Sequence, residues 1–320
     1  MKIEIVTPAP PRSRFGNRVT AIRWARILRE LGHRVILSQG YGGESCDLLV
    51  ALHAKRSYAS VRDFHRDRRE QPIIVALTGT DLYRDLPRSR RAQKSLELAS
   101  RLVVLQPKAR ERFEPRLRKK VRVIYQSCPL SRTRATSCEP RRPRRTFDVC
   151  VIGHLRPVKD PFRAALAARR LPRSSRVRIL HLGAAMDDGM ARRAQTEMKV
   201  NSRYRWFGEL PPRRVQQILQ RSELCVLSSR MEGGANVISE AVVAGVPLLA
   251  SRIPGSVGLL GENYPGYFRV GDTVDLAELL RRAEMDRVFL NRLSARCKKL
   301  APLFDPCRET MAWRRLLQEL

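Results

Sequence analysis

Residues 228–251 read SSRMEGGANVISEAVVAGVPLLAS and hold two carboxylates, a Gly-Gly pair and an apolar run within one short stretch. The pattern after the glycines predicts a helix at Asn236–Ala244 and a buried strand at Pro247–Ala250. A turn that follows one strand, opens a helix and leads to the next strand is typical of a parallel α/β sheet. The stretch therefore indicates the fold class and marks one loop of the sheet as unusual.

The residues of this loop suit a phosphorylated ligand. Gly233 and Gly234 leave backbone N–H groups uncovered at the start of the helix, where unpaired donors and the positive end of the helix dipole attract a diphosphate. Glu240 lies about two turns further on, so its carboxylate can accept hydrogen bonds from ribose hydroxyls, and Glu232 can reach a sugar held over the phosphates. The layout suits a nucleotide sugar, although either Glu alone is equally well a solvated acid on an amphipathic helix.

Composition limits the class of protein. The chain has 320 residues and is 43% hydrophobic, enough for two cores, since domains commonly have roughly 100–150 residues. Its seven cysteines are scattered, odd in number and without a C-x-x-C pair, which argues against a disulfide framework and a zinc site. The N-terminal MKIEIVTPAPP is unlike a secretory signal, and no apolar stretch approaches the ~20 residues of a membrane-spanning helix. We therefore expect a cytoplasmic protein.

The formal net charge of +32 is compatible with nucleic acid, an anionic membrane or acidic small molecules as partners. A nucleic-acid surface usually concentrates its charge in one tract with interleaved aromatic residues, whereas here Arg is spread over nearly every predicted helix and aromatics are 6%. Nucleic-acid binding is therefore the minority alternative. A peripheral membrane role stays open because basic helices are attracted to anionic lipid, but we expect no stable membrane insertion.

Apolar β-type runs alternate with helical patterns twice along the chain, which predicts two doubly wound α/β domains. Strands are predicted in the first half at Lys2–Thr7, Arg34–Ser38, Asp47–Leu52, Ile73–Leu77, Leu102–Leu105 and Val121–Ile124, with a helix at Asn17–Leu31. In the second half, strands are predicted at Phe147–Ile152, Val177–Leu182, Tyr204–Phe207 and Leu224–Leu227, and helices near Pro161–Arg170, Asp187–Lys199 and Pro212–Arg221.

The predicted domains are 1–128 and 147–304, joined by a Ser-, Thr-, Pro- and Arg-rich linker at 129–146. A helix at 305–320 has apolar positions that suit packing either back on the first domain or on the second. Doubly wound sheets bind ligands in the crevice outside the carboxyl ends of their strands. The loops after the strands are therefore where functional residues are expected.

The loop after the first strand of the second domain reads GHLRPVKDPFRA. Arg156 and Lys159 lie three residues apart just before a helix. Such a pair can clamp a diphosphate, Arg through its planar fork and Lys as a point charge. In so basic a chain the same spacing also arises between solvated cations, so the position after a strand is what favours the functional interpretation.

Three loops of the first half carry polar residues after strands. After the first strand, Gly16, Asn17, Arg18 and Thr20 form a polar turn into a helix, which is either an anion-binding terminus or an ordinary helix start capped by Asn17. His53 ends the third strand and is followed by Lys55 and Arg56; it faces the ligand crevice or is a packed core residue. The fourth strand ends in Thr78, Gly79, Thr80 and Asp81, whose hydroxyls and amides suit an oxyanion.

Two motifs together resemble a known family. The pair Glu232 and Glu240 around the glycines, with the run AVVAGVPLLAS, resembles the donor-site signature of the retaining glycosyltransferase family 4, which has the GT-B fold. The resemblance implies that Gly153, Arg156 and Lys159 neutralise a leaving diphosphate, and that the loop WFGELPP surrounds the nucleobase. The donor-binding residues that it implies are Gly153, Phe207, Gly208, Leu210, Gly233, Gly234, Ala235, Asn236, Val237 and Glu240.

A narrower resemblance is carried by GNRVTAIRWARIL, ALHAKRS, LTGTDLY, GHLRPVKDPF and MEGGANVISEA, which are similar to the loops of bacterial selenosugar synthases of selenoneine biosynthesis. It implies transfer of N-acetylglucosamine from UDP-N-acetylglucosamine to the selenium of selenophosphate, giving a 1-seleno sugar, UDP and phosphate with retained configuration. The implied catalytic residues are Arg156, Lys159, Glu232 and His53. The implied acceptor-binding residues are Gly16, Asn17, Arg18, Thr20, Lys55, Thr78, Gly79, Thr80 and Asp81.

The chemistry of that acceptor fits what the sequence lacks. Selenophosphate is already an ionised nucleophile, so no strong protein base has to be supplied. We expect no cofactor and no metal, and an enzyme that produces selenophosphate as a working partner. The alternative is a family 4 enzyme that glycosylates a lipid-linked or sugar hydroxyl.

Overall fold

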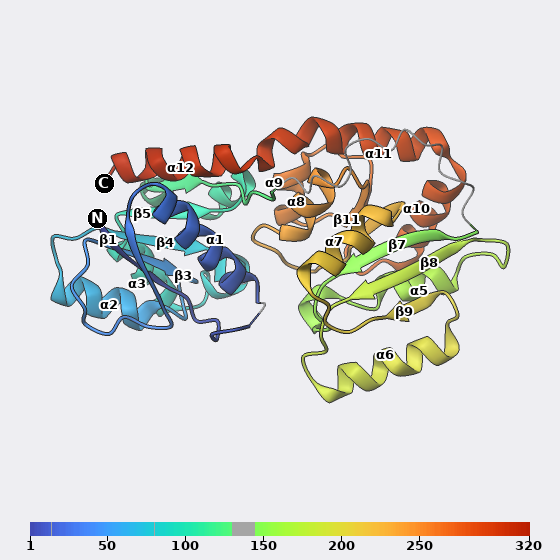
Figure 1. The fold of residues 1–320 in the computed structure, drawn as a ribbon, viewed down its shortest axis with the longest axis horizontal. Helices are drawn as coiled ribbons and strands as arrows, with labels where there is room; N and C mark the ends of the chain where they lie inside the picture. Colours follow the sequence, from blue (N-terminus) through green and yellow to red (C-terminus); the bar gives the residue numbers. More distant parts are fainter. Residues whose placement is uncertain (14, 80, 130–144) are drawn as a thin grey trace. The chain divides into compact units, whose positions relative to one another are not determined.

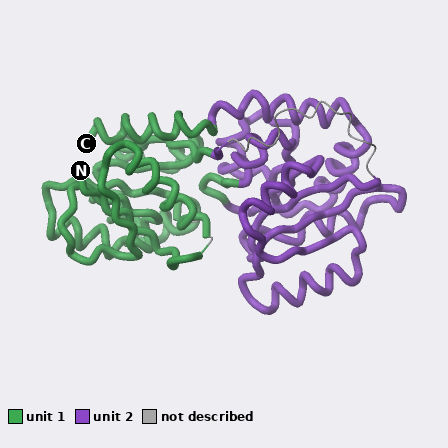
Figure 2. Tube along the Cα trace, viewed as in Figure 1, with its two compact units in different colours: residues 1–127, 232–236, 304–320 green, residues 128–231, 237–303 purple. Residues whose placement is uncertain are grey.

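The computed structural model describes residues 1–13, 15–79, 81–129 and 145–320. They form two compact units (Figure 2): residues 1–127, 232–236 and 304–320 make unit 1, and residues 128–231 and 237–303 make unit 2. Each unit holds one six-stranded parallel sheet. The predicted fold class, two doubly wound α/β domains, is confirmed. The linker predicted at 129–146 lies almost wholly outside the described residues.

The sheet of unit 1 has the strand order β2-β1-β3-β4-β5-β6 (Figure 1). Its strands are β1 (Lys2–Val6), β2 (Arg34–Ser38), β3 (Leu48–Leu52), β4 (Ile73–Leu77), β5 (Arg101–Val104) and β6 (Val121–Val123). The central strands β3 and β4 read LLVAL and IIVAL and are buried along their whole length, because helices cover both faces of the sheet. The order reverses between β1 and β3, so ligands are expected at the carboxyl ends of these two strands.

The helical elements of unit 1 are α1 (Gly16–Glu30), α2 (Tyr58–Asp67), the π-helical turn η1 (Asp81–Asp85), α3 (Arg90–Leu98), the 3-10 turn η2 (Pro107–Arg112), α4 (Pro115–Arg118) and α12 (Pro306–Gln318). One face of the sheet packs on α1 and α12, where the rings of Trp24 and Trp313 meet edge to face with centroids 4.9 Å apart. The other face packs on α2 and α3 through Phe64 and Leu96. The last helix of the chain thus belongs to unit 1.

The sheet of unit 2 has the order β12-β11-β10-β7-β8-β9. Its strands are β7 (Phe147–Ile152), β8 (Val177–Leu182), β9 (Tyr204–Trp206), β10 (Leu224–Leu227), β11 (Leu248–Ser251) and β12 (Tyr267–Phe268). Its helical elements are η4 (Pro157–Lys159), α5 (Arg163–Arg169), α6 (Asp188–Val200), α7 (Pro212–Arg221), α8 (Asn236–Val243), α9 (Pro254–Leu260), α10 (Thr273–Met285), α11 (Arg287–Leu300) and η5 (Ala301–Phe304), which runs on into unit 1.

The order in this second sheet reverses between β7 and β10, which makes the carboxyl ends of these strands the expected ligand position. In the part of the chain that the structure describes, no helix is both long and apolar enough to span a bilayer.

Candidate functional site

The loops after β7, β8 and β9 meet in unit 2. Gly183 has a φ of 151°, and a Cβ there would lie 2.1 Å from the Gly153 carbonyl oxygen, so the first two loops cross in backbone contact. The Gly183 N–H donates to the Gly208 carbonyl at 2.8 Å. The structure therefore brings Gly153 and Gly208 together through a third glycine, which the sequence interpretation did not include.

His181 of β8 stabilises the contact between these loops through hydrogen bonds. Its Nε2 lies 3.1 Å from the Gly153 carbonyl oxygen and its Nδ1 lies 3.0 Å from the Tyr204 hydroxyl. Burial lowers the pKa of His181 to about 4, so the imidazole is neutral near pH 7. The neutral ring then donates from Nε2 to Gly153 and accepts at Nδ1 from Tyr204. This fixes the backbone at the carboxyl end of β7.

Arg156 and Lys159 bracket the turn η4, directly after that backbone. Lys159 and Asp160 accept hydrogen bonds through their carbonyls from the Ser228 hydroxyl, at 3.1 and 2.9 Å. The Arg230 N–H donates to the Val158 carbonyl at 2.9 Å. Hydrogen bonds thus join the loops after β7 and β10 where the strand order reverses.

The half-buried Arg156 has a donor without a partner. Its Nε is shielded from solvent and makes no hydrogen bond within the described part of the chain. A desolvated guanidinium donor is costly unless it is paired. Arg156 is therefore suited to an anion that arrives from outside the protein.

The other predicted donor-side residues are spread along unit 2. Phe207 is 46% exposed and comes just before Gly208. Glu240 lines a hollow together with residues of α7 and with Cys128. Burial raises the pKa of the Cys150 thiol on β7 to about 12, and the Glu240 carboxylate contributes in the same direction. Glu240 thus lies close to a switch-point strand, but neither Arg156 nor Phe207 lines the hollow that it faces.

The glycine loop belongs to unit 1 and packs there against the loop after β4. A Cβ on Gly233 would lie 2.6 Å from the Thr78 carbonyl carbon and 2.7 Å from the Gly79 nitrogen. Thr78 in turn donates from its hydroxyl to Asn17 Oδ1 at 2.6 Å. Asn17, Thr78, Gly79 and Gly233 come from three distant parts of the sequence and form one contact. Asn17 is not the cap of α1, because the helix begins at Gly16 after Phe15 and has no side-chain cap.

The end of this loop is held by α1 and by the residues after β6. Arg23 donates to Asn236 Oδ1 at 3.3 and 3.4 Å. The Gln126 amide, in the orientation that satisfies all its neighbours, donates to Asn236 Oδ1 at 2.9 Å and to the Gly234 carbonyl at 3.2 Å. Its oxygen then accepts from Thr20 at 2.5 Å. Thr20 is buried in this network, so it supports the loop and is not placed to touch an acceptor.

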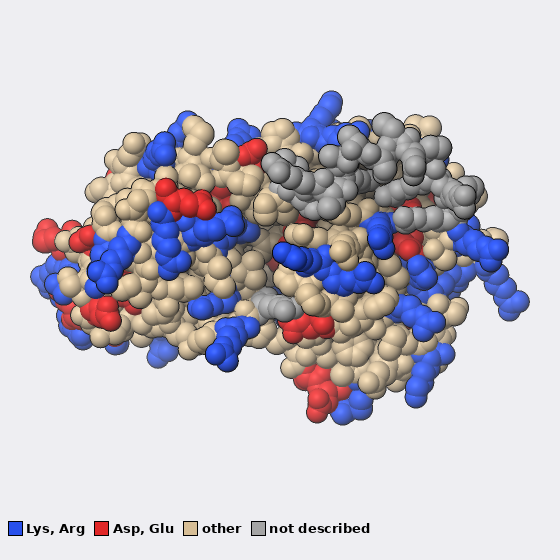
Figure 3. Space-filling model, in the orientation of Figure 1, with Lys and Arg blue, Asp and Glu red and all other residues tan. Residues whose placement is uncertain are grey.

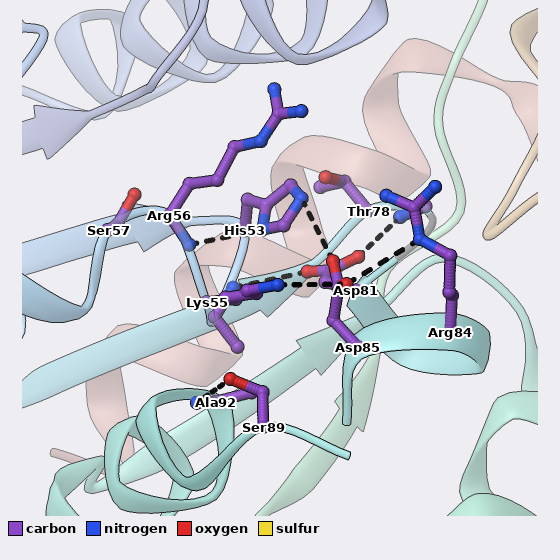
Figure 4. A network of polar contacts seen from close by, with 12 residues as sticks. His53, Lys55, Arg56, Ser57, Thr78, Asp81, Arg84, Asp85, Ser89 and Ala92 are labelled. Carbon is purple, nitrogen blue, oxygen red and sulfur yellow. Dashed lines mark hydrogen bonds and ion pairs between the residues drawn. The ribbon is translucent and has the colours of Figure 1, made fainter. Parts of the chain in front are cut away.

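A second polar cluster surrounds His53, directly after β3 (Figure 4). His53 is buried and has a φ of 76°, a left-handed conformation that is strained for a residue with a side chain. Its Nδ1 accepts the Arg56 N–H at 3.3 Å, which leaves the proton of the neutral ring on Nε2. That Nε2 lies 3.8 Å from Asp85 Oδ2 and has no hydrogen-bond partner in the described residues.

Asp85 of η1 forms ion pairs with two cations near His53. Its Oδ1 lies 3.5 Å from both Lys55 Nζ and Arg84 Nε. The pKa of His53 is lowered, chiefly by burial and further by Arg56, while Asp81 and Asp85 oppose the shift. His53 is therefore a neutral hydrogen-bond donor near pH 7, beside an ion-paired carboxylate.

Asp81 corrects one expectation. Its buried carboxylate accepts the Gly79 N–H at 2.8 Å and the Ala54 N–H at 3.2 Å. The Gly79 amide is therefore already paired and is not free for a substrate oxyanion. Asp81 instead ties the loop after β4 to the loop after β3. Thr80 lies outside the described residues.

Arg18 and Gly16 lie at the start of α1. The Arg18 Nε is buried without a hydrogen-bond partner among the described residues, whereas nothing lies within 4 Å of a Cβ built on Gly16.

Sequence reasoning missed Arg23, Asp85 and Gln126. One signal was present: Asp85 follows Asp81 by four residues in a loop that had already been singled out. Arg23 and Gln126 carry no signal that separates them from ordinary helix and loop residues.

Charged side chains outside these loops are dispersed. Figure 3 shows Lys and Arg scattered among Asp and Glu on the visible face, without one continuous basic tract. Among the described residues, no three His, Cys, Asp or Glu side chains are grouped so that they could hold a metal ion.

The chain is similar to a known family and to curated proteins. The family model described as glycosyl transferases group 1 matches residues 137–301. The UDP-Gal:alpha-D-GlcNAc-diphosphoundecaprenol alpha-1,3-galactosyltransferase of Escherichia coli is 29% identical over 164 residues, which cover 48% of this chain and 41% of that enzyme. The chain thus matches less than half the length of this relative.

Comparison with solved structures extends over the whole chain. HepE of Anabaena, solved with UDP and glucose, has a TM-score of 0.77 at 16% identity and covers 100% of both chains. Sucrose-phosphate synthase of Thermosynechococcus elongatus has a TM-score of 0.74 at 15% identity, over 99% of this chain and 98% of that one. At these identities the likeness shows the fold alone, which is GT-B.

Proposed function

Because this chain belongs to the group 1 glycosyl transferases, we propose that it transfers a sugar from a uridine diphosphate sugar to an acceptor bound by unit 1. The observation that carries the donor half is the buried, unpaired Nε of Arg156 beside Lys159, where the order of the unit 2 sheet reverses. Diphosphate oxygens would satisfy this donor. HepE is described with UDP-glucose and the Escherichia coli relative as a UDP-galactose enzyme, which supports uridine diphosphate as the leaving group.

Each donor-side residue has one role in this proposal. Arg156 and Lys159 offset the negative charge that develops on UDP as the bond from the sugar C1 to the phosphate oxygen breaks. The amides of Gly233–Asn236 bind the diphosphate, Glu232 orients the sugar and Glu240 accepts hydrogen bonds from the ribose. Retention follows from attack on the face that UDP leaves.

The acceptor is proposed to be selenophosphate, because the cluster around His53 is poorly equipped to deprotonate a hydroxyl. His53 carries its proton on Nε2 and uses Nδ1 to accept the Arg56 amide. Asp85 is ion-paired with Lys55 and Arg84. Neither group is a ready general base. An acceptor that arrives ionised needs none, and the Nε2–H of His53 with the cation of Lys55 suits its oxygens.

A selenium lone pair forms the C1–Se bond while the C1–O bond to UDP breaks. Water then cleaves the P–Se bond and releases phosphate and the 1-seleno sugar. With N-acetylglucosamine as the sugar, the product is 1-seleno-N-acetylglucosamine.

Mass spectrometry of wild-type protein with UDP-N-acetylglucosamine, with and without selenophosphate, tests both halves. A selenium-containing sugar formed together with UDP would establish the acceptor. UDP-sugar binding without a seleno sugar would leave the donor half standing and return the acceptor to a lipid-linked or sugar hydroxyl, as in the name of the Escherichia coli relative. Absence of UDP binding by calorimetry would refute the donor half.

Two pairs of variants assign the halves to their residues. Arg156→Ala should abolish most turnover, while Arg170→Ala, an exposed arginine of the same unit, should leave it unchanged. Lys55→Ala should raise the Michaelis constant for the acceptor, while Lys94→Ala, exposed on α3, should not. Equal behaviour within either pair would remove the tested residue from the site.

A further inference from the structure

One carboxylate of the last helix is buried in the interior of unit 1. Glu309 of α12 is 2% exposed. Its Oε1 accepts the indole N–H of Trp24 at 2.8 Å. Its Oε2 accepts the backbone N–H of Ser127 at 2.8 Å and the Ser127 hydroxyl at 2.5 Å. A buried carboxylate with three donors is held firmly in one orientation.

Glu309 also fixes the direction of Arg23. The Arg23 Nε lies 3.4 Å from Glu309 Oε2, and the two side chains are 13% and 0% exposed. Arg23 Nη1 further donates to the Ser127 carbonyl at 3.1 Å. The same guanidinium donates to Asn236 Oδ1 at 3.3 and 3.4 Å, and its Nη2 also donates to the Gln126 amide oxygen at 2.9 Å. Because the guanidinium fork is planar and rigid, fixing one edge fixes the other.

Gln126 precedes Ser127 in the chain, so the hydrogen bonds from Ser127 to Glu309 also restrain the backbone at Gln126. Gln126 donates to Asn236 Oδ1 and to the Gly234 carbonyl. Two routes therefore lead from Glu309 to the glycine loop, one through Arg23 and one through the backbone at Ser127. All of these residues belong to unit 1.

We propose that Glu309 is a positioning residue for donor binding, acting through Arg23 and Gln126 on the loop Glu232–Asn236. The C-terminal helix thereby sets the geometry of a loop more than seventy residues earlier in the sequence. The inference rests on the proposed function, because it takes this loop as the binder of the UDP diphosphate. Without Glu309, the Arg23 guanidinium loses its buried counter-charge and turns toward water, and Asn236 loses the hydrogen bonds from Arg23.

The test measures the UDP dissociation constant by calorimetry for Glu309→Gln, Asn236→Ala and the double variant. We expect each single change to weaken UDP binding about tenfold, and the double variant to be no weaker than Asn236→Ala, because both routes from Glu309 reach Asn236. A merely structural role for Glu309 would instead make the two losses multiply, and this outcome would overturn the proposal. Glu319→Gln is the control, since Glu319 pairs with Arg101 and Arg122 at the far end of α12 and should leave UDP affinity unchanged.

A second variant covers the case in which Glu309→Gln does not fold. Arg23→Lys keeps the charge beside Glu309 but cannot span to Asn236 with a planar fork. It should weaken UDP binding as much as Asn236→Ala does, and wild-type affinity in Arg23→Lys would overturn the inference. Wild-type protein that binds no UDP would refute the proposed function and this inference with it. UDP binding that is unaffected by any of these changes would refute the inference alone.

Discussion

Gly233→Ala is the sharpest perturbation that the structure offers. The added Cβ would lie 2.6 Å from the Thr78 carbonyl carbon and 2.7 Å from the Gly79 nitrogen. Both neighbours are backbone atoms and cannot rotate away. Gly233 does not have a positive φ, so the substitution introduces no backbone strain of its own. The effect is therefore steric, and inserting a methyl group against tightly packed backbone costs about 1–3 kcal/mol.

That free energy is expected to appear in ligand binding more than in folding. The loop Glu232–Asn236 contributes no strand to the sheet of unit 1, so it can move away from Thr78 while the sheet stays intact. Movement takes its amides away from the diphosphate. Since 1.4 kcal/mol corresponds to a tenfold change in a dissociation constant, UDP should bind roughly 5- to 140-fold more weakly.

The assay is calorimetric titration with UDP, paired with urea unfolding. Gly42→Ala is the matched control, because Gly42 is exposed and a Cβ there has nothing within 4 Å. The control should bind UDP like the wild type. Unchanged UDP affinity in a folded Gly233→Ala protein would refute the reasoning, since the loop would then not hold the diphosphate. A full loss in unfolding free energy with unchanged affinity would show that the loop belongs to the core.

Four further outcomes are expected. Glu240→Ala should weaken UDP binding by calorimetry, because the ribose loses a carboxylate acceptor; unchanged affinity would remove Glu240 from the site. Arg156→Ala or Lys159→Ala should lower turnover by roughly a hundredfold, and full activity in both would place the diphosphate elsewhere. His53→Ala should raise the Michaelis constant for selenophosphate more than that for the UDP-sugar, whereas equal rises would argue against an acceptor role. The pKa of His181 is about 4 in the folded protein against 6.5 ordinarily, so the neutral imidazole contributes fully to stability above pH 6.5, and this contribution is lost as the pH falls toward 4. Urea unfolding should show that the free energy of unfolding falls by about 3 kcal/mol over this pH range. His181→Phe should abolish this pH dependence.

The fold could be predicted from the sequence because parallel strands buried on both faces leave unbroken apolar runs. Phe147–Ile152, Val177–Leu182 and Leu224–Leu227 begin and end in the structure where the sequence predicts. Strand β12 was not predicted, since Tyr267 and Phe268 are too few to show a period. The apolar positions of α12 suited either domain, and tertiary contacts such as the pairing of Trp313 with Trp24 place this helix on unit 1.

The loops of the site could be predicted, but the roles of their residues could not. Parallel topology brings the carboxyl ends of neighbouring strands to one edge of a sheet, so the residues after each strand were legitimate candidates. Which polar group pairs with which depends on packing between distant segments. The sequence therefore suggested Asp81 as a ligand contact, whereas in the structure its buried carboxylate accepts hydrogen bonds from two backbone amides. Thr20 likewise bonds to Gln126, more than a hundred residues away.

The net charge of +32 says less about function than the desolvation of a few arginines. Exposed ion pairs such as Arg66 with Asp67 contribute little energy and select no ligand. A guanidinium donor that is shielded from water and unpaired is different, because an incoming anion repays its desolvation. Arg156 and Arg18 have such a donor, each in the segment that follows the first strand of its sheet. Arg23 Nε also makes no hydrogen bond but lies beside the Glu309 carboxylate, and Arg68 at the end of α2 shares the property away from any strand end. The pairing of desolvation with a strand end, absent at Arg68, is what separates the candidate ligand contacts from the rest of a very basic surface.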